Sequence, residues 1–306
     1  STSTTLTRST PRITTGMGVV IRLATRGSRQ AVTQAEGVQH ALSQRGVKSQ
    51  LVIVETHGDR TQAANTPLHE IGGQGVFTKE IQQAVLDGRA DAAVHSAKDL
   101  PTERPHQLDI ASIMARRSPT DALIGRRLLD LEDGASVATG SVRRRAQIAE
   151  IRPDLNFLEL RGNIETRLQK IPDSGSIVMA VSALEVLNLT SHIAEELDPA
   201  VFVPAVGQGA IAVECRNDSS EVLEALARIS DETTATEVTI ERAYLGELGA
   251  GCSAPVGAHV SGGVLTAFLG GDESNFRVSI ELTGDLKRDI AAARALANEA
   301  RATVGV

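Results

Sequence analysis

The chain has 306 residues, of which 31 are Lys or Arg and 38 are Asp or Glu, for a formal net charge of -7. Its length favours about two domains, and a hydrophobic content of 41% allows buried cores, which excludes wholesale disorder. The acidic balance, with five Phe, one Tyr and no Trp, argues against a nucleic-acid partner. No apolar run reaches the roughly 20 residues that a membrane-spanning helix needs, so we expect no membrane partner.

Two cysteines, Cys215 and Cys252, are too few for a disulfide framework and have no metal-ligand spacing around them. We therefore expect a cytoplasmic protein without a bound metal, and a monomer by default. Residues 1–19 are rich in Ser and Thr and lack the apolar segment of a secretory signal. We expect a disordered tail there, with the end of an organelle transit peptide as the alternative.

From residue 19 onward, apolar strand patterns alternate with helical patterns. Strands are predicted at 19–27, 51–56, 91–101 and 108–116. One helix follows the first strand, and another begins after Thr78 as its N-cap. The polar, glycine-containing stretch 57–75 has no period and is predicted to be a loop that could cover a site.

The same rhythm restarts after Pro119. Strands are predicted at 136–140, 156–160 and 177–181, helices at 141–151 and 163–171. The apolar stretches 201–206 and 210–215 suit a chain that crosses back to the first domain. A helical stretch at 219–249 is followed by three alternating segments joined by Gly-rich turns, at 254–262, 263–271 and 276–284, and then by a helix at 285–300.

This pattern predicts an α/β fold with two doubly wound domains around a cleft, like those of solute-binding proteins, and a small C-terminal α+β domain with an antiparallel sheet. The predicted boundaries are a tail at 1–19, domain 1 at 20–114 and 209–230, domain 2 at 115–208, and domain 3 at 231–306.

Three adjacent arginines, Arg143–Arg145, follow the strand and turn Ala138-Thr139-Gly140-Ser141. Ser141 is predicted to cap the helix, whose N-terminus suits an anion. Because successive helical residues diverge by about 100°, at most two of these arginines can serve one pocket. Arginines also follow the other predicted strands at Arg26 and Arg161, which favours a ligand with several carboxylates over a nucleotide phosphate.

Two further stretches carry candidate chemistry. In HSAKDLP (95–101), Asp99 is a candidate acid beside Lys98, although a plain salt bridge between the two is an equal alternative. In GAGCSAP (249–255), small neighbours surround Cys252, which is either an attachment point or an inert turn cysteine. His95 is interpreted as a core histidine, and Cys215 as a buried small apolar residue.

Seven stretches together resemble the hydroxymethylbilane synthase (porphobilinogen deaminase) family: ATRGS, GVFTKEI, RADAAVHSAKDLP, GSVRRRAQ, LELRGNIETRL, PAVGQGAIAVECR and ERAYLGELGAGCSAPVGA. The resemblance implies a transferase of tetrapyrrole and heme biosynthesis. Such an enzyme joins four porphobilinogen molecules head to tail with loss of ammonia, on a dipyrromethane cofactor held by a thioether.

The resemblance also implies roles for individual residues. Cys252 would hold the cofactor and Asp99 would be the catalytic acid. The cofactor would further be bound by Ser96, Lys98, Asp99, Thr139, Ser141, Arg143, Arg144, Arg161 and Gly162. The porphobilinogen and the growing chain would be bound by Arg26, Ser28, Gln34, Arg161 and Arg167.

Three positions depart from the family pattern. Gln74 stands where a loop lysine is common, and Val186 stands where an arginine is thought to bind substrate. In the common family motif TRxSPLA, this chain has Arg29 in place of Pro and Gln30 in place of Leu. Arg29 and Arg145 are candidates to replace the missing charge. Two other classes stay open from the residues alone: an anion-binding solute receptor, and a phosphate-handling transferase that uses Ser141–Arg144.

Overall fold

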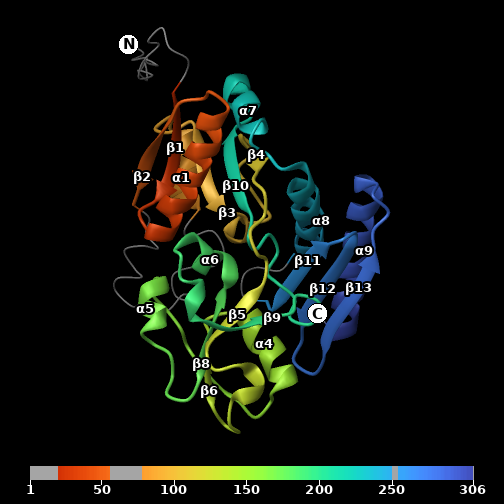
Figure 1. The fold of residues 1–306 in the computed structure, drawn as a ribbon. Helices are drawn as coiled ribbons and strands as arrows, with labels where there is room; N and C mark the ends of the chain where they lie inside the picture. The colour runs from red at the N-terminus through yellow and green to blue at the C-terminus, as the bar shows by residue number, and fades with distance from the viewer. Residues whose placement is uncertain (1–19, 56–77, 250–253, 306) are drawn as a thin grey trace, which may run out of the picture.

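The computed structural model describes residues 20–55, 78–249 and 254–305. They form two five-stranded α/β sheets, one above the other in Figure 1, and a small antiparallel sheet beside them. The fold class expected from the sequence is therefore confirmed. Cys252 and the stretch 57–75 lie outside the described residues.

The first sheet has the strand order β2-β1-β3-β10-β4. Strand β1 pairs in parallel with both of its neighbours, β2 and β3, as strands joined through crossover helices do. Strand β10 comes from late in the chain and is antiparallel to both of its neighbours, β3 and β4. The elements are β1 (Ile21–Arg26), α1 (Arg29–Gln44), β2 (Ser49–Val54), α3 (Lys79–Leu86), β3 (Ala92–Ser96), η1 (Ala97–Asp99), β4 (Leu108–Ile113), β10 (Ile211–Arg216) and α7 (Ser220–Ala227).

The second sheet has the order β7-β6-β8-β5-β9 and repeats this mixed arrangement, with parallel pairs around β6 and antiparallel pairs around β5. Its core is made by fully buried strand residues such as Val137 and Val178. The elements are β5 (Asp121–Gly125), η2 (Leu128–Asp130), β6 (Ser136–Ala138), α4 (Val142–Ile151), β7 (Asn156–Leu158), α5 (Ile164–Leu168), β8 (Ser176–Ala180), α6 (Val181–Val186), η3 (Thr190–His192) and β9 (Ile193–Leu197).

The third sheet is a meander of three strands, and the long helices α8 and α9 pack together against it. The buried side chains of Tyr244, Phe276 and Leu296 belong to its core. The elements are α8 (Glu232–Leu248), β11 (Val256–Ser261), β12 (Val264–Gly270), β13 (Asn275–Glu281) and α9 (Leu286–Val304).

Three details differ from the sequence expectations. The short strands β5 and β9 were not predicted. The helical stretch 219–249 is two helices, α7 and α8. Thr78 stands at the N-cap position of α3, but its side chain makes no capping hydrogen bond, because its backbone is already helical.

A buried carboxylate, Glu241 in α8, joins the three sheets. It accepts both Nη atoms of Arg116, each at 2.8 Å, from the link between the first and second sheets. It also accepts the backbone N–H of Gly207, in the returning link, at 2.7 Å, and that of Val260, in β11, at 2.9 Å. One side chain therefore holds both links and the third sheet in place.

Candidate functional site

The carboxyl end of β3 carries the proposed acid. The strand is buried up to His95, and the 3-10 turn that follows leaves Asp99 exposed between the half-buried Lys98 and the buried Leu100. Among the described residues, Asp99 has neither a hydrogen bond nor an ion pair, so the alternative of a direct salt bridge with Lys98 is not observed. A cavity, here called the Asp99 cavity, lies beside it and is lined by Arg26, Ser28, Gln30, Ala31, Gln34, Thr78, Ile81, Val94, His95, Ser96 and Asp99.

The start of α1 supplies one wall of the Asp99 cavity. Ser28 caps this helix by accepting the backbone N–H of Ala31 at 3.3 Å. Gln34 lies further along the helix and exchanges hydrogen bonds with Ser96 at the end of β3, where its Nε2 donates to Oγ at 3.1 Å. The structure therefore places Arg26, Ser28, Gln34, Ser96 and Asp99 around one space, although they come from four elements: β1, the start of α1, β3 and η1.

The three adjacent arginines divide as the helical spacing predicts. Arg143 and Arg144 are buried and both bind Asp121 of β5: Arg143 Nη2 donates to Oδ2 at 2.8 Å, and Arg144 Nη2 donates to Oδ1 at 2.7 Å. Arg145 is only partly buried and pairs with Glu159 at 2.9 Å. The anion between the buried pair is thus a side chain of the protein, which the sequence analysis did not anticipate.

Asp121 stays ionised in this setting. Burial alone would raise its pKa, but the charges and hydrogen bonds of Arg143 and Arg144 hold the pKa far below its usual value.

Side-chain hydrogen bonds fix the turn before α4. Ser141 caps it by accepting the N–H of Arg144 at 3.4 Å, as predicted, and the Oγ1 of Thr139 accepts the N–H of Ser141 at 3.2 Å.

Gln208 connects the two sheets at this point. Its Nε2 donates to Asp121 Oδ1 at 3.1 Å and to the carbonyl of Pro119 at 2.7 Å, while its Oε1 accepts Lys98 Nζ at 3.4 Å. Sequence reasoning missed both Gln208 and Asp121. The sequence signal that could have pointed to Gln208 is its position between two glycines. Both of these glycines take positive φ angles in the structure.

The neighbourhood of Lys98 is strongly cationic. The pKa of Lys98 is lowered to about 8, mainly by burial and also by the charges of Arg144 and Arg143, against the opposing effects of Asp99 and Asp121. Burial likewise lowers the pKa of Arg167 to about 10, with Arg144 and Arg161 acting in the same direction and Asp99 against them. The site therefore holds more positive than negative charge, which fits a ligand with several carboxylates.

Arg161 and Arg167 lie on either side of the short turn into α5. Gly162 takes a φ of +114°, and a Cβ there would lie 2.8 Å from Thr166 Cγ2, so the turn requires glycine. Its carbonyl accepts Nε of Arg167 at 2.8 Å, which fixes the direction of that side chain.

The departures from the family pattern have structural counterparts. Val186 is buried among the apolar side chains that α6 packs onto the second sheet. Arg29 is bound to Glu165 at 2.9 Å, and Arg145 is bound to Glu159, so each candidate replacement cation already has a carboxylate partner. Gln74 and Cys252 lie outside the described residues.

Two family models cover most of the chain. Residues 21–224 match the porphobilinogen deaminase dipyromethane cofactor binding domain, and residues 235–302 match the porphobilinogen deaminase C-terminal domain. The chain belongs to the porphobilinogen deaminase family. It is accordingly a transferase of tetrapyrrole biosynthesis with a dipyrromethane cofactor, which joins porphobilinogen units head to tail and releases ammonia.

Relatives from several organisms carry the same name. The porphobilinogen deaminase of Cutibacterium acnes is 42% identical over 90% of this chain and 91% of its own length. That of Acidothermus cellulolyticus is 46% identical over 81% of this chain and 76% of its own length. The probable porphobilinogen deaminase of Methanopyrus kandleri is 43% identical over 80% and 84%.

Solved structures with some likeness include immunogenic lipoprotein A from Vibrio vulnificus, with a TM-score of 0.43 and 13% identity over 71% of this chain and 97% of that one. A nutrient binding protein from Burkholderia cenocepacia bound to methionine has a TM-score of 0.44 and 13% identity over 70% and 93%. Values this low support no argument about function.

Within the described residues, no helix is long and apolar enough to cross a membrane, and no cluster of His, Cys, Asp or Glu could hold a metal ion.

Proposed function

We propose that Asp99 is the catalytic residue of hydroxymethylbilane synthesis in this chain. The observation that supports this role is the position of its carboxylate. It is exposed at a strand end, lines the Asp99 cavity, and acts electrostatically on Lys98 and Arg167 while it has no ion-pair partner among the described residues. A carboxylate placed in this way can act on a bound substrate instead of on a neighbouring side chain.

In this proposal, Asp99 acts on porphobilinogen in two ways. As the bond between the methylene carbon and the amino group breaks and ammonia leaves, positive charge develops on the substrate, and the Asp99 carboxylate stabilises it. When the new carbon–carbon bond has formed, the pyrrole carbon that made it loses a proton, which Asp99 accepts. Lys98 and Arg167 keep substrate carboxylates away from Asp99 by binding them.

The dipyrromethane cofactor supplies the pyrrole carbon on which the chain is started. We propose that Cys252 holds it through a thioether, in the segment between α8 and β11. Its carboxylates are assigned to cations, hydroxyls and one glycine backbone around β3, α4 and the start of α5: Ser96, Lys98, Thr139, Ser141, Arg143, Arg144, Arg161 and Gly162. Asp99 is assigned to the same set of cofactor contacts. The positive excess around Lys98 supports this assignment.

Porphobilinogen and the growing chain are assigned to Arg26, Ser28, Gln34, Arg161 and Arg167. Arg26, Ser28 and Gln34 line the Asp99 cavity, whereas Arg161 and Arg167 reach the site from the second sheet. Guanidinium groups suit this task because they bind carboxylates through two parallel hydrogen bonds.

The domain division proposed here follows the three sheets: 20–114 with 209–230, then 115–208, then 231–306, after a tail at 1–19. Strand β10 belongs to the first sheet although it lies late in the sequence, which supports the first of these assignments. We further propose a monomer in the cytoplasm. The buried free thiol of Cys215 supports a reducing compartment.

Intact-mass measurement tests the attachment site. The protein from cells that make porphobilinogen should carry a dipyrrole adduct, which Cys252→Ser should remove. Cys215→Ser, at the other cysteine, should retain it, because that thiol is fully buried in the first sheet. An adduct that survives in Cys252→Ser would refute the attachment.

Ammonia release tests the role of Asp99. Asp99→Asn should keep the fold and the adduct but lower turnover by about 10²- to 10⁴-fold. Asp109→Asn, which changes an exposed carboxylate on β4 outside the Asp99 cavity, should leave turnover unchanged. Turnover of Asp99→Asn within a few-fold of the unmodified enzyme would remove Asp99 from the mechanism.

A further inference from the structure

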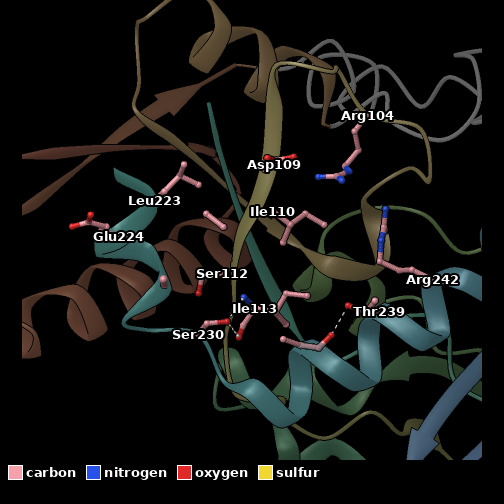
Figure 2. Close-up of a pocket in the computed structure, with 13 residues that line it drawn as sticks. Arg104, Asp109, Ile110, Ser112, Ile113, Leu223, Glu224, Ser230, Thr239 and Arg242 are labelled. Atoms are coloured by element: carbon pink, nitrogen blue, oxygen red, sulfur yellow. Dashed lines mark hydrogen bonds between the residues drawn. The ribbon is translucent and has the colours of Figure 1, made fainter. Parts of the chain in front are cut away.

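A second cavity lies at the outer edge of the first sheet, away from the Asp99 cavity. It is bounded by the edge strand β4, helix α7 and the first half of α8, and is here called the β4 groove (Figure 2). Its volume is about 720 Å³. It shares no lining residue with the Asp99 cavity, so an occupant would not overlap the substrate site.

The walls of the β4 groove are mainly apolar. Ile110 and Ile113 come from the strand, Leu223 and Ala227 from α7, and Ala235 from α8. Ile110, Leu223 and Ala235 are only partly buried, so apolar surface of the strand and both helices remains open to a ligand. Burying this surface is favourable for any partner with an apolar body.

Two arginines stand at one end of the groove, where Figure 2 shows the side chain of Arg242 directed toward Arg104. Arg242 is fixed, because its Nη1 and Nη2 donate to the carbonyls of Leu100 and Pro101 at 3.1 and 2.7 Å. Burial lowers the pKa of Arg242, and the charge of Arg104 lowers it further, with Glu214 acting in the opposite direction. The two guanidinium groups therefore repel each other across this end.

Among the residues that the structure describes, Arg104 lacks the partners that a guanidinium normally has. Its Nη1 is buried without a hydrogen-bond acceptor, and no hydrogen bond or ion pair of its side chain is found within the described ranges 20–55, 78–249 and 254–305. The groove also contains the buried Ser112, whose Oγ likewise has no hydrogen-bond partner among the described residues. Buried donors without acceptors are costly, so an anion between the two arginines would relieve a real deficit.

The charges at the rest of the groove restrict the ligand. Asp109 and Glu224 also line it, and neither forms an ion pair with either arginine among the described residues. In Figure 2, Glu224 lies on the side opposite Arg104 and Arg242. A second negative group on the ligand would meet these carboxylates, so the arrangement favours one anionic head and an apolar remainder.

The edge of β4 is also closed to an added strand at one end. The N–H of Ile113 donates to Ser230 Oγ at 3.2 Å, and its carbonyl accepts the N–H of Asp231 at 2.8 Å. Because both backbone groups are occupied, a peptide cannot pair along the full strand, and the groove suits a small molecule better.

We propose that the β4 groove binds a small monocarboxylate with an apolar chain or ring, whose carboxylate lies between Arg104 and Arg242 and whose apolar part lies along Ile110 and Leu223. Such a ligand differs from the pyrroles of the Asp99 cavity, which carry several carboxylates. The proposal does not depend on the catalytic role of Asp99.

Octanoate is the probe for the test, with 1-octanol as the uncharged molecule of the same chain length. Methyl NMR of the isoleucine-labelled holoenzyme should show saturable shifts at Ile110 and Ile113 on titration with octanoate. Arg104→Gln should weaken this binding by about tenfold or more, because a charge-assisted hydrogen bond is lost. Among the described residues, the Arg104 side chain has no hydrogen bond or ion pair to lose, so this variant should fold normally.

Arg228→Gln is the matched control, since it removes an exposed arginine just after α7 that does not line the groove. It should bind octanoate as the unmodified enzyme does. Equal affinity in Arg104→Gln, equal shifts with 1-octanol, or shifts confined to isoleucines outside the groove would each overturn the proposal.

Discussion

Arg29 of α1 and Glu165 of α5 form an ion pair of 2.9 Å that links the first sheet to the second. Both partners lie next to proposed substrate ligands: Arg29 follows Ser28, and Glu165 is two residues before Arg167. The pair therefore holds the start of α1 against α5 and restrains the two sheets relative to each other.

Glu165→Gln should let the two sheets move further apart. Since the pair is exposed, its loss should change the free energy of unfolding by less than about 1 kcal/mol. Small-angle scattering should show a larger radius of gyration at low salt, and the unmodified protein should approach this value as salt screens the pair. Glu159→Gln is the matched control, because it removes an equally exposed ion pair within the second sheet. Equal behaviour of the two variants would contradict a restraining role.

The Glu241 junction should be one of the polar sites whose loss destabilises the fold strongly. Glu241→Gln would leave the Arg116 charge buried without its partner, which costs about 3 to 5 kcal/mol of unfolding free energy. Chemical denaturation measures this loss. Glu237→Gln is the control, since Glu237 lies on the same helix, is partly exposed, and is 3.7 Å from Arg116 Nη1. A loss below about 1 kcal/mol in Glu241→Gln would mean that the junction is replaceable.

The alternation of strands and helices was predictable because most of these elements carry a clear apolar period. Strands β5 and β9 escaped detection because polar residues limit their apolar runs: β5 has only three apolar residues after Asp121, and β9 contains Glu195 and Glu196. The apolar stretch 201–206 resembles a strand but is not one. Phe202 and Val203 are buried, but the N–H of Val203 donates to the Gln147 side chain and its carbonyl accepts Arg143 and Gln147, instead of pairing with a strand.

The site was predictable only where residues are close in sequence. Ser96, Lys98 and Asp99 share one strand end, and Arg143 and Arg144 follow one turn. Asp121, by contrast, is 22 residues from Arg143, and Glu241 is 125 residues from Arg116. No local pattern connects such partners, so the carboxylates that neutralise these arginines had to come from the structure.

Asp121→Asn should destabilise the protein, because Arg143 and Arg144 would then share a buried site without a full negative charge. The expected loss is about 3 to 5 kcal/mol near neutral pH. Since the pKa of Asp121 is lowered by folding, its stabilisation is present above the unfolded-state pKa of about 3.9 and is lost as the pH falls toward the folded-state pKa. The difference between the unmodified protein and Asp121→Asn should therefore shrink only below about pH 4.

The exposed Asp130→Asn provides the control for that series, and it should unfold like the unmodified protein at every pH. If Asp121→Asn lost stability but the loss did not change below pH 4, the carboxylate would act through packing instead of charge.

Lys98 should make the stability of the cofactor-free protein depend on alkaline pH. Because burial lowers its pKa from 10.5 to about 8, the unfolded chain binds more protons than the folded one between these values, and stability should rise as the pH passes through this range. A shift of this size corresponds to roughly 3 kcal/mol. Denaturation of the unmodified protein and of Lys98→Met at pH 7.5 and 10.5 gives the difference that belongs to Lys98. A polycarboxylate beside Lys98 would raise its pKa, so the holoenzyme should show a smaller rise than the cofactor-free Cys252→Ser protein. An equal rise in both forms would mean that the cofactor carboxylates do not lie near Lys98.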